Sequence, residues 1–343
     1  MSDSKYSEAG VDLEAGKRAT DLMKSAVQAT YTPEVLSGLG SFGGLFSGQL
    51  LKGMDEPILV ASTDGVGTKT QVASRLNQWS SIGYDIVNHC VNDILVQGAR
   101  PLFFLDYVAS SKLDPEQIAM VVRGVAGACQ AAGCALLGGE TAEMPGVYRE
   151  GELDLVGTVV GVVDQQDLID GSTINYGDAI MALPSNGLHT NGFTLARNVL
   201  AEESWLDSHA ALNGRAIGNE LLAPHRCYLP QFNSLQESGV DIHGLAHITG
   251  GGVTDNLPRI LPDDMSAVIE RGSWPEPLIF KLIQEQGDIS DAEMFNVFNM
   301  GLGMLVVVSK DDVSLVQRTL GDDVFLVGEV VQGDGVVEVT SDQ

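Results

Sequence analysis

Six residues near position 64 have the types and spacing of a loop that could bind phosphate. The segment Asp64-Gly-Val-Gly-Thr-Lys69 follows an apolar run, Pro57 to Thr63, that predicts a short buried strand. Its glycines allow a ligand to approach the backbone closely, its carboxylate can hold Mg²⁺, and its lysine can neutralise phosphate oxygens. The GxxxxGK[ST] spacing of a Walker A loop is absent. Alone, the segment fits an ordinary Asp-Gly turn at least as well, so other parts of the chain must decide.

A predicted helix over Trp79 to Gly98 carries a second group of polar residues. Its apolar positions fall on one side of the helical wheel, and the other side holds Asp85, Asn88, His89, Asn92 and Asp93. Asn and Asp are poor helix formers and are uncommon on a face that only meets solvent. The pattern therefore favours specific contacts over a merely solvated face.

Further acids follow the next two predicted strands. Pro101 to Tyr107 contains Asp106, and Cys134 to Leu137 leads into Gly139-Glu140-Thr141. We expect Asp64, Asp106 and Glu140 at strand ends, where ligands gather in layered α/β folds. Several such acids together with Asp93 predict a site for a divalent metal.

Two glycine-rich turns in the second half pair histidine with small polar residues. One follows a predicted strand over Asp178 to Leu183, and the other begins at His247. Turns into helix N-termini suit phosphate, although Thr190, Asn191 or Thr249 could simply cap these helices. We interpret the turns as a substrate pocket, with candidate residues Ser185, His189, Asn191, His247, Thr249 and Gly250.

Composition limits the classes of partner. The chain has 46 acidic and 19 basic residues and a formal charge of −27, with no basic cluster, which argues against nucleic acid. No apolar run reaches the roughly 18 residues that span a bilayer, and the N-terminus does not resemble a signal peptide. The four cysteines show no CxxC spacing, so we expect reduced thiols and a cytoplasmic location.

The predicted helices and strands indicate an α/β protein of two domains. Helices are expected in the segment 1–30, which carries Lys24, and over Pro115 to Ala132, with another strand over Leu153 to Val163. A polar break at 165–177 separates an expected domain 1–168 from a domain 169–343, in which helices and strands alternate.

The motifs occur in an order that resembles one family. YSEAGVD, STDGVGTK, VNDILVQGA, PLFFLDY, GGETAEMPG, SNGLHTNG, HITGGG and FNMGLGM together resemble aminoimidazole ribonucleotide synthetases, the phosphoribosylformylglycinamidine cyclo-ligases of purine synthesis. The departures are mild, at Lys17 and Asn186. The resemblance implies an N-terminal domain whose small mixed sheet pairs across a homodimer, an α/β C-terminal domain, and an active site between the domains.

The resemblance also implies a reaction and roles for residues. Formylglycinamidine ribonucleotide and ATP would give aminoimidazole ribonucleotide, ADP and phosphate, with Mg²⁺ required and the need for K⁺ left open. Metal ligands would be Asp64, Asp93 and Glu140, and catalytic residues Lys69, His189 and His247. ATP would be bound by Lys24, Asp64, Gly65, Gly67, Thr68, Lys69, Asn92, Asp93, Gly139, Glu140 and Thr141.

Other classes of protein share part of this pattern. Thiamine-monophosphate kinases, selenophosphate synthetases and the synthetase that makes formylglycinamidine ribonucleotide also phosphorylate a substrate from ATP. The selenophosphate enzymes fit least, because the first cysteine here is Cys90. A non-catalytic nucleotide-binding scaffold is a different class of protein. It would be expected to lack the acids that bind metal, whereas Asp64, Asp93, Asp106 and Glu140 are all present.

Overall fold

The computed structural model describes residues 12–340, which divide into two compact units. Unit 1 comprises the chain up to Ile94 together with Ala99–Gln166, and unit 2 comprises Leu95–Gly98 together with the chain from Asp167 onward. The boundary after Gln166 lies two residues before the expected one. Within the described part of the chain no helix has both the length and the apolar character needed to cross a membrane. The four cysteines are all free thiols.

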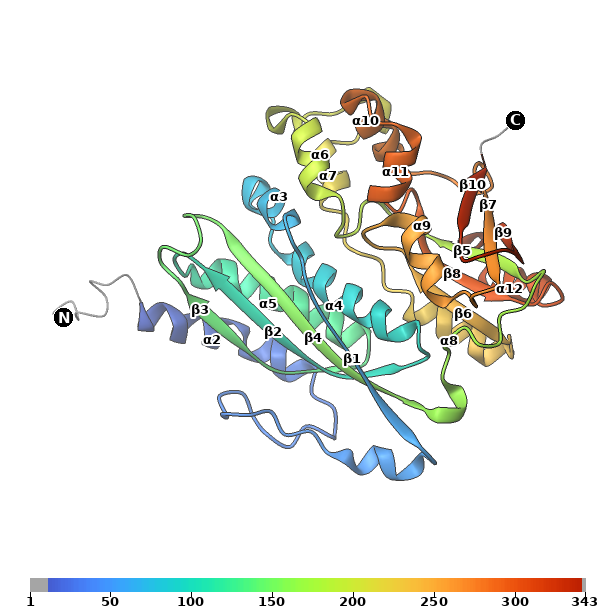
Figure 1. Cartoon of the computed structure of the whole chain (residues 1–343). Helices are drawn as coiled ribbons and strands as arrows, with labels where there is room; N and C mark the ends of the chain where they lie inside the picture. Colours follow the sequence, from blue (N-terminus) through green and yellow to red (C-terminus); the bar gives the residue numbers. More distant parts are fainter. Residues whose placement is uncertain (1–11, 341–343) are drawn as a thin grey trace. The chain divides into compact units, whose positions relative to one another are not determined.

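Unit 1 is a four-stranded mixed sheet with helices on one face (Figure 1). The strand order is β1-β4-β2-β3, with β4 antiparallel to both neighbours and β2 parallel to β3. The strands are β1 (Pro57–Gly65), β2 (Arg100–Ser110), β3 (Ala135–Glu143) and β4 (Leu153–Asp164). The helices are α2 (Leu13–Ala29), α3 (Lys69–Leu76), α4 (Ser80–Leu95) and α5 (Pro115–Ala131), and a 3-10 turn spans Gly48–Gly53.

Two glycines let α4 and α5 approach each other closely. A Cβ on Gly83 would lie 2.4 Å from the Val121 carbonyl oxygen, and one on Gly124 would lie 2.1 Å from that of Ser80. Only glycine at both positions allows this backbone-to-backbone contact. It fixes the position of α4, the helix that carries the polar group predicted from the sequence.

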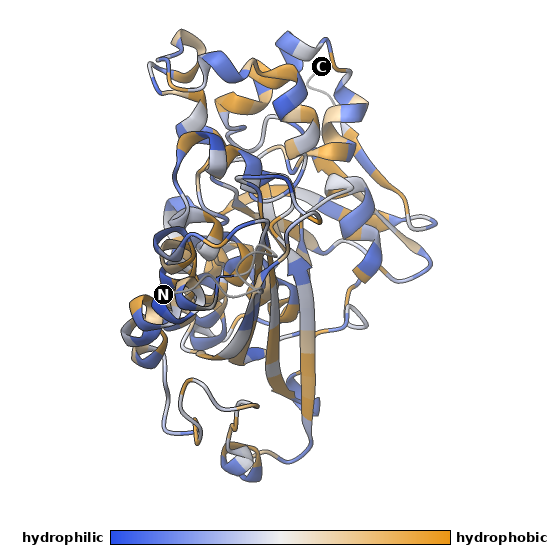
Figure 2. Ribbon diagram, turned by 90° about the vertical axis from the view of Figure 1, so that its left-hand side faces the viewer, coloured by the Kyte–Doolittle hydropathy of each residue, from blue (hydrophilic) through white to orange (hydrophobic). Residues whose placement is uncertain are grey.

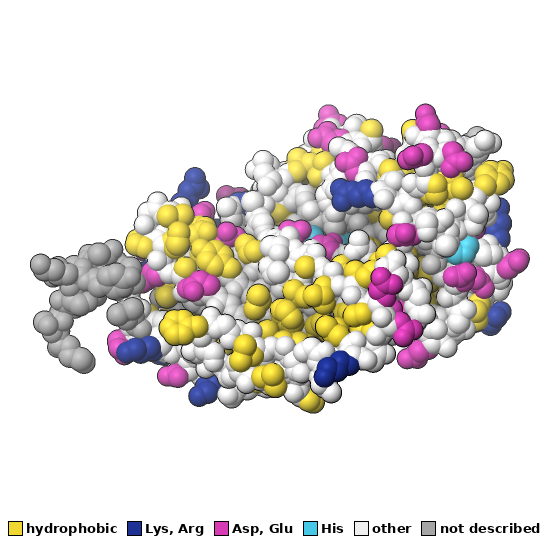
Figure 3. Space-filling view, turned by 60° about the horizontal axis from the view of Figure 1, so that its bottom comes forward, with side chains coloured by type: hydrophobic (Ala, Val, Ile, Leu, Met, Phe, Trp, Pro, Cys, Tyr) yellow, Lys and Arg dark blue, Asp and Glu magenta, His cyan; other side chains and the backbone are white. Residues whose placement is uncertain are grey.

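The two faces of this sheet differ in what covers them. Along β1, Val60, Ser62 and Asp64 face the helices, and Leu59 lies on the opposite, outer face, where its side chain is 61% exposed. The segment around Phe46 covers part of the outer face, leaving an apolar hollow that Leu59, Phe103 and Leu105 help to line. Figure 2 shows the hydrophobic positions along these strands, and Figure 3 shows hydrophobic side chains gathered on the underside of unit 1.

Unit 2 is built around a six-stranded mixed sheet of order β10-β7-β9-β5-β8-β6. Its strands are β5 (Ala179–Pro184), β6 (Ile242–His247), β7 (Met265–Glu270), β8 (Leu302–Val308), β9 (Phe325–Gln332) and β10 (Val337–Thr340). All seven residues of β8 are buried, so both faces of the sheet are covered along this strand. Because β5 and β6 are each antiparallel to β8, the ends of β5 and β6 meet the start of β8 at one edge of the sheet.

Helices pack on this sheet in contacting groups. α8 contacts α12, α9 contacts α11, and α10 contacts α6 and α11. The helices are α6 (Phe193–Val199), α7 (Ile217–Leu221), α8 (Leu229–Ser238), α9 (Gly252–Asn256), α10 (Leu278–Gly287), α11 (Asp291–Val297) and α12 (Val313–Leu320).

One expectation about unit 1 is wrong for two of its three acids. Asp64 lies at the end of β1, one residue before Gly65, but Asp106 and Glu140 lie inside strands that continue to Ser110 and Glu143. These two strands continue because ladder pairing continues through the acidic and glycine positions: Asp106 pairs with Gly157 of β4, and Glu140 pairs with Tyr107 of β2. The three acids therefore have a defined face of the sheet, which a loop would not give them.

Candidate functional site

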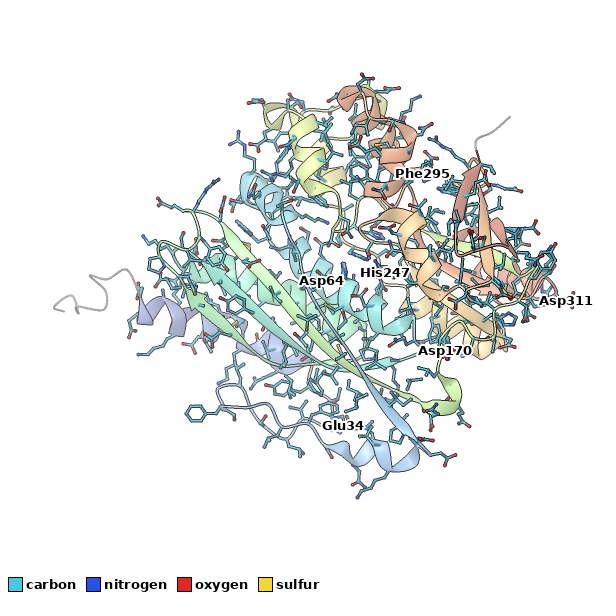
Figure 4. The ribbon with its side chains drawn as sticks, in the orientation of Figure 1. Glu34, Asp64, Asp170, His247, Phe295 and Asp311 are labelled. Carbon is cyan, nitrogen blue, oxygen red and sulfur yellow. The ribbon has the colours of Figure 1, made fainter. Side chains whose placement is uncertain are left out.

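Two of the predicted carboxylates converge on one histidine in unit 1. His89 on α4 places Nε2 2.9 Å from Oδ2 of Asp64 and 3.6 Å from Oδ2 of Asp93. Ser62 on β1 donates a hydrogen bond of 2.8 Å to the same oxygen of Asp93. Figure 4 marks Asp64 at the end of β1. The polar face of α4 is thus used for contacts, as its residue types predicted.

The charges in this cluster depend on one another. Burial alone would raise the pKa of Asp64, but the hydrogen bond and charge of His89 outweigh it, so the pKa is lowered. Burial opposes protonation of His89, yet the bond to Asp64 and the charges of Asp93, Asp64 and Asp85 leave its pKa raised. The site therefore brings the carboxylate oxygens of Asp64 and Asp93 together beside one imidazole. Oxygen donors that converge in this way fit a hard cation such as Mg²⁺.

Lys69 lies in a different setting from the one expected of a phosphate-binding residue. It is the first residue of α3, its side chain is fully buried, and its Nζ lies 2.9 Å from Oδ1 of Asp85 on α4. Burial lowers the pKa of Lys69, and the Asp85 carboxylate opposes that effect. In the structure this ammonium joins α3 to α4 through a buried ion pair.

The remaining predicted nucleotide-binding residues of unit 1 fall into two groups. The first group is near the carboxylates in the chain: Asn92 is buried on α4, Gly65 ends β1, and Gly67 and Thr68 lie between β1 and α3. Gly67 has a φ of 68°, a conformation that favours glycine. Gly139, Glu140 and Thr141 instead line a cavity of about 850 Å³ with residues of α2 and the glycine-rich segment 38–44. Lys24 is exposed on α2.

Glu140 is not brought to Asp64 within the chain. Asp64 pairs with Gly157, Gly157 with Asp106, and Asp106 with Gly139, so three strand spacings separate β1 from β3. At about 4.8 Å a spacing, the separation is roughly 14 Å. Glu140 pairs with Tyr107 and so lies on the face opposite Asp106 and Asp64. A single ion therefore cannot have both Asp64 and Glu140 of one chain as ligands.

The two turns of unit 2 that we interpreted as a substrate pocket lie at the edge where β5, β6 and β8 meet. Ser185 directly follows β5 and donates a 2.8 Å hydrogen bond to Asn299, whose amide in turn donates to the Gly187 carbonyl at 2.9 Å. A Cβ on Gly250 would lie 3.2 Å from the side-chain oxygen of Asn191. The buried amide nitrogen of Asn191 has no hydrogen-bond partner among the described residues. The two turns were predicted from the sequence to serve one pocket, whereas Asn299 was not among the predicted residues.

Histidines occupy the same edge. His247 is the last residue of β6 and is labelled in Figure 4, and His189 follows β5 with a φ of 61°. Thr249 lies just beyond, its hydroxyl 3.2 Å from Oδ1 of Asn256. A third histidine, His225, stacks on His189 with ring centroids 4.0 Å apart. Nothing in the sequence pointed to His225, because it stands between Pro224 and Arg226 with no glycine-rich turn around it.

Comparison with known proteins identifies the class of protein to which this chain belongs. Residues 50–163 match the family model described as AIR synthase related protein, N-terminal domain, and residues 175–340 match that of its C-terminal domain. The chain is therefore an AIR synthase-related protein of two domains.

Named proteins with similar sequences identify the family within this class. The chain is 50% identical over 335 residues to a phosphoribosylformylglycinamidine cyclo-ligase of Desulfitobacterium hafniense, covering 96% of this chain and 98% of that protein. It is 49% identical to one of Geobacillus kaustophilus, with 96% of each chain covered. This chain belongs to the phosphoribosylformylglycinamidine cyclo-ligase family.

Solved structures share the fold at low sequence identity. A thiamine-monophosphate kinase from Stenotrophomonas maltophilia has a TM-score of 0.69 at 16% identity, with 94% of this chain and 95% of that chain covered. The hydrogenase maturation protein HypE in complex with ATP has a TM-score of 0.66 at 16% identity, with 97% and 93% covered. At these identities the likeness concerns the fold alone.

Proposed function

We propose that this chain catalyses the ATP-dependent closure of formylglycinamidine ribonucleotide to aminoimidazole ribonucleotide, releasing ADP and phosphate. The observation that carries the proposal is 50% identity to a named cyclo-ligase over nearly the whole of both chains. The contacts of Asp64 and Asp93 in unit 1 and the grouping of His189 and His247 in unit 2 support the proposal.

The nucleotide part of the reaction is assigned to unit 1. Asp64 and Asp93 would hold Mg²⁺, which supplies charge neutralisation to the triphosphate when bound. The cavity of about 850 Å³ beside Gly139 and Thr141 has the size of a pocket for a nucleotide. Lys24, on the same helix as cavity residues of α2, is proposed to approach the nucleotide. The buried ion pair of Lys69 with Asp85 supports a role for Lys69 in holding α3 against α4, rather than in direct contact with phosphate.

The substrate part is assigned to unit 2. Ser185, Asn191, Thr249 and Gly250 would bind the ribose phosphate and the reacting amide, because they place polar side chains and backbone amides at one edge of the sheet. His189 and His247 would exchange protons with the substrate. An amide oxygen leaves poorly, so ATP would first phosphorylate the formamide oxygen. The amidine nitrogen would then attack that carbon, lose a proton and expel phosphate.

We also propose that the chain is a homodimer through the outer face of the unit 1 sheet. Leu59 and Leu105 on that face are 61% and 37% exposed and border an apolar hollow. An apolar strand face of this kind is costly to leave in water, and a second copy would cover it with an equivalent face.

The test of the proposed activity is direct. The purified protein is incubated with formylglycinamidine ribonucleotide and Mg²⁺-ATP, and aminoimidazole, ADP and free phosphate are measured together. A cyclo-ligase gives the three products in equal amounts, whereas a kinase leaves the phosphate on its product. Failure to consume ATP with this substrate would refute the proposal.

A further inference from the structure

Three buried imidazole rings lie together in unit 2, and one of them has no role in the function proposed above. His189, His225 and His247 are 1%, 1% and 7% exposed. His189 and His247 follow β5 and end β6, where we placed the substrate. His225 comes from the separate segment between α7 and α8.

His225 is joined to His247 by a hydrogen bond. The two Nε2 atoms lie 3.0 Å apart, a separation at which one nitrogen must donate and the other accept. On the other side of the ring, Nδ1 of His225 lies 3.3 Å from Oγ1 of Thr190. Because the Nε2–Nε2 contact needs a single shared proton, the protonation of His247 is tied to that of His225.

The segment that carries His225 is firmly held. Arg226 donates to the Pro184 carbonyl at 3.0 Å and pairs with Asp323, and Tyr228 donates to the same carbonyl at 3.1 Å. Asn186 donates to the Pro224 carbonyl at 2.8 Å. These hydrogen bonds therefore fix the His225 segment against the end of β5. Stacking on His189 restricts the imidazole ring of His225 further.

We infer that His225 is a positioning residue that sets the tautomer and basicity of His247, an inference that rests on the proposed function. When Nδ1 of His225 donates to Thr190, its Nε2 accepts from His247, and His247 keeps Nδ1 as a proton acceptor. A proton that His247 takes at Nδ1 from the substrate then leaves an imidazolium whose Nε2–H is held by a neutral imidazole. That contact stabilises the charged form and raises the basicity of His247.

A bound transition metal is the other use for three histidines, and the geometry disfavours it. The ligand nitrogens lie within 4.8 Å of one another, but the rings of His189 and His225 are stacked at 21°. Metals bind imidazole nitrogens close to the ring plane, and an ion in the plane of one stacked ring lies well outside that of the other. The Nε2–Nε2 contact would also have to be broken.

The test compares two substitutions of His225. His225→Ala removes the ring, and we expect kcat to fall by about 10²-fold, the lower end of general acid–base contributions, with an unchanged KM for ATP. The acidic limb of the kcat–pH profile should move to lower pH. His225→Gln keeps one side-chain donor and acceptor near Nε2, so it should restore part of kcat without restoring the pH profile. His209→Asn, which replaces a histidine outside the cluster, should match the parent enzyme.

A second measurement does not depend on activity. Nitrogen-15 NMR of the resting protein reports which nitrogen of His247 carries the proton, and the spectrum should change in both His225 variants but not in His209→Asn. An unchanged His247 tautomer in a folded His225→Ala variant would overturn the inference, as would an unchanged pH profile. Stoichiometric binding of Zn²⁺ that His225→Gln abolishes would overturn it in favour of a metal site. Absence of cyclo-ligase activity in the parent, with the NMR result as expected, would instead refute the proposed function.

Discussion

At the scale of single residues, the chemistry of each acid depends on its immediate partners. The hydrogen bond and charge of His89 lower the pKa of Asp64, whereas Asp106, on the same face of the sheet, forms no ion pair with a described residue. Its carboxyl packs against Gly139, where a Cβ would lie 1.8 Å from Oδ1. Burial raises the pKa of Asp106 to about 7. Residue types in the sequence identified the acids, but only the packing around each one separates them.

Asp93→Asn tests the metal assignment. The substitution removes a charge from the converging pair, and we expect turnover to fall by about 10²-fold or more, with a higher Mg²⁺ concentration needed for half-maximal rate. Asp21→Asn, at an exposed position on α2, serves as the matched control and should leave both quantities unchanged. Parental turnover of Asp93→Asn at saturating metal would contradict the assignment.

Asp106→Asn tests the raised pKa. The native state keeps the Asp106 proton up to about pH 7, while the unfolded chain loses it near the ordinary value of 3.8. Unfolding therefore releases a proton between these pH values, so this group lowers stability as pH rises from about 4 to 7, with no further change above. At about 1.4 kcal/mol per pKa unit the effect is at most roughly 4 kcal/mol, less for a partly exposed carboxyl.

The measurement is the free energy of unfolding in urea at several pH values. Asp106→Asn should gain stability relative to the parent as pH rises through this window, while Asp55→Asn, an exposed acid, should run parallel to the parent. A difference between Asp106→Asn and the parent that stays constant with pH would show that the carboxyl ionises normally in the native state.

At the scale of elements, long periodic segments were predictable and short ones were not. The helix expected over Trp79 to Gly98 and the strand over Pro57 to Thr63 correspond to α4 and β1, because each shows a clear hydrophobic period. α7 and α11 span only five and seven residues, too few to establish a period. β6 was not predicted because Ile-His-Gly-Leu-Ala-His lacks alternation, being buried on both faces beside β8. The partnership of His225 with His247 depends on this tertiary arrangement.

Gly124→Ala tests the contact between α4 and α5. The added methyl would meet the Ser80 carbonyl at 2.1 Å, and we expect a loss of about 1–3 kcal/mol, as for other overpacked sites. Gly16→Ala is the matched control, since it lies inside α2 and an added Cβ would meet nothing within 4 Å. That change should stabilise the helix by up to about 1 kcal/mol. Urea unfolding measures both, and equal effects would show that the close approach is not required.

At the scale of the whole molecule, charge and exposed apolar surface should determine behaviour in solution. A net charge of −27 makes the folded chain repel itself, and salt screens that repulsion. Raising KCl from about 0.01 M to about 1 M shortens the screening length from about 30 Å to about 3 Å, so we expect Tm to rise by roughly 5 °C or more. Thermal unfolding at constant pH measures this, and a Tm that is independent of KCl would contradict it.

Leu59→Asp tests the proposed dimer. A charge on the outer sheet face should convert the dimer into a monomer, as measured by sedimentation or light scattering, because a buried carboxylate without a partner is costly. Leu206→Asp replaces a leucine of unit 2 that is 77% exposed and should leave the oligomeric state unchanged. A Leu59→Asp protein that has the same mass as the parent would place the interface elsewhere.

The position of β8 has a consequence for synthesis on the ribosome. Its two neighbours, β5 and β6, leave the exit tunnel first, and neither can hydrogen-bond the other in the final sheet. In a nascent chain that ends before Leu302, β5 and β6 therefore have unpaired backbone N–H and C=O groups and a gap between them where β8 will lie. Such edges can pair with strands of other chains. The histidines beside that gap cannot reach their final places until β8 has been made, so ring closure should be among the last properties that the growing polypeptide acquires.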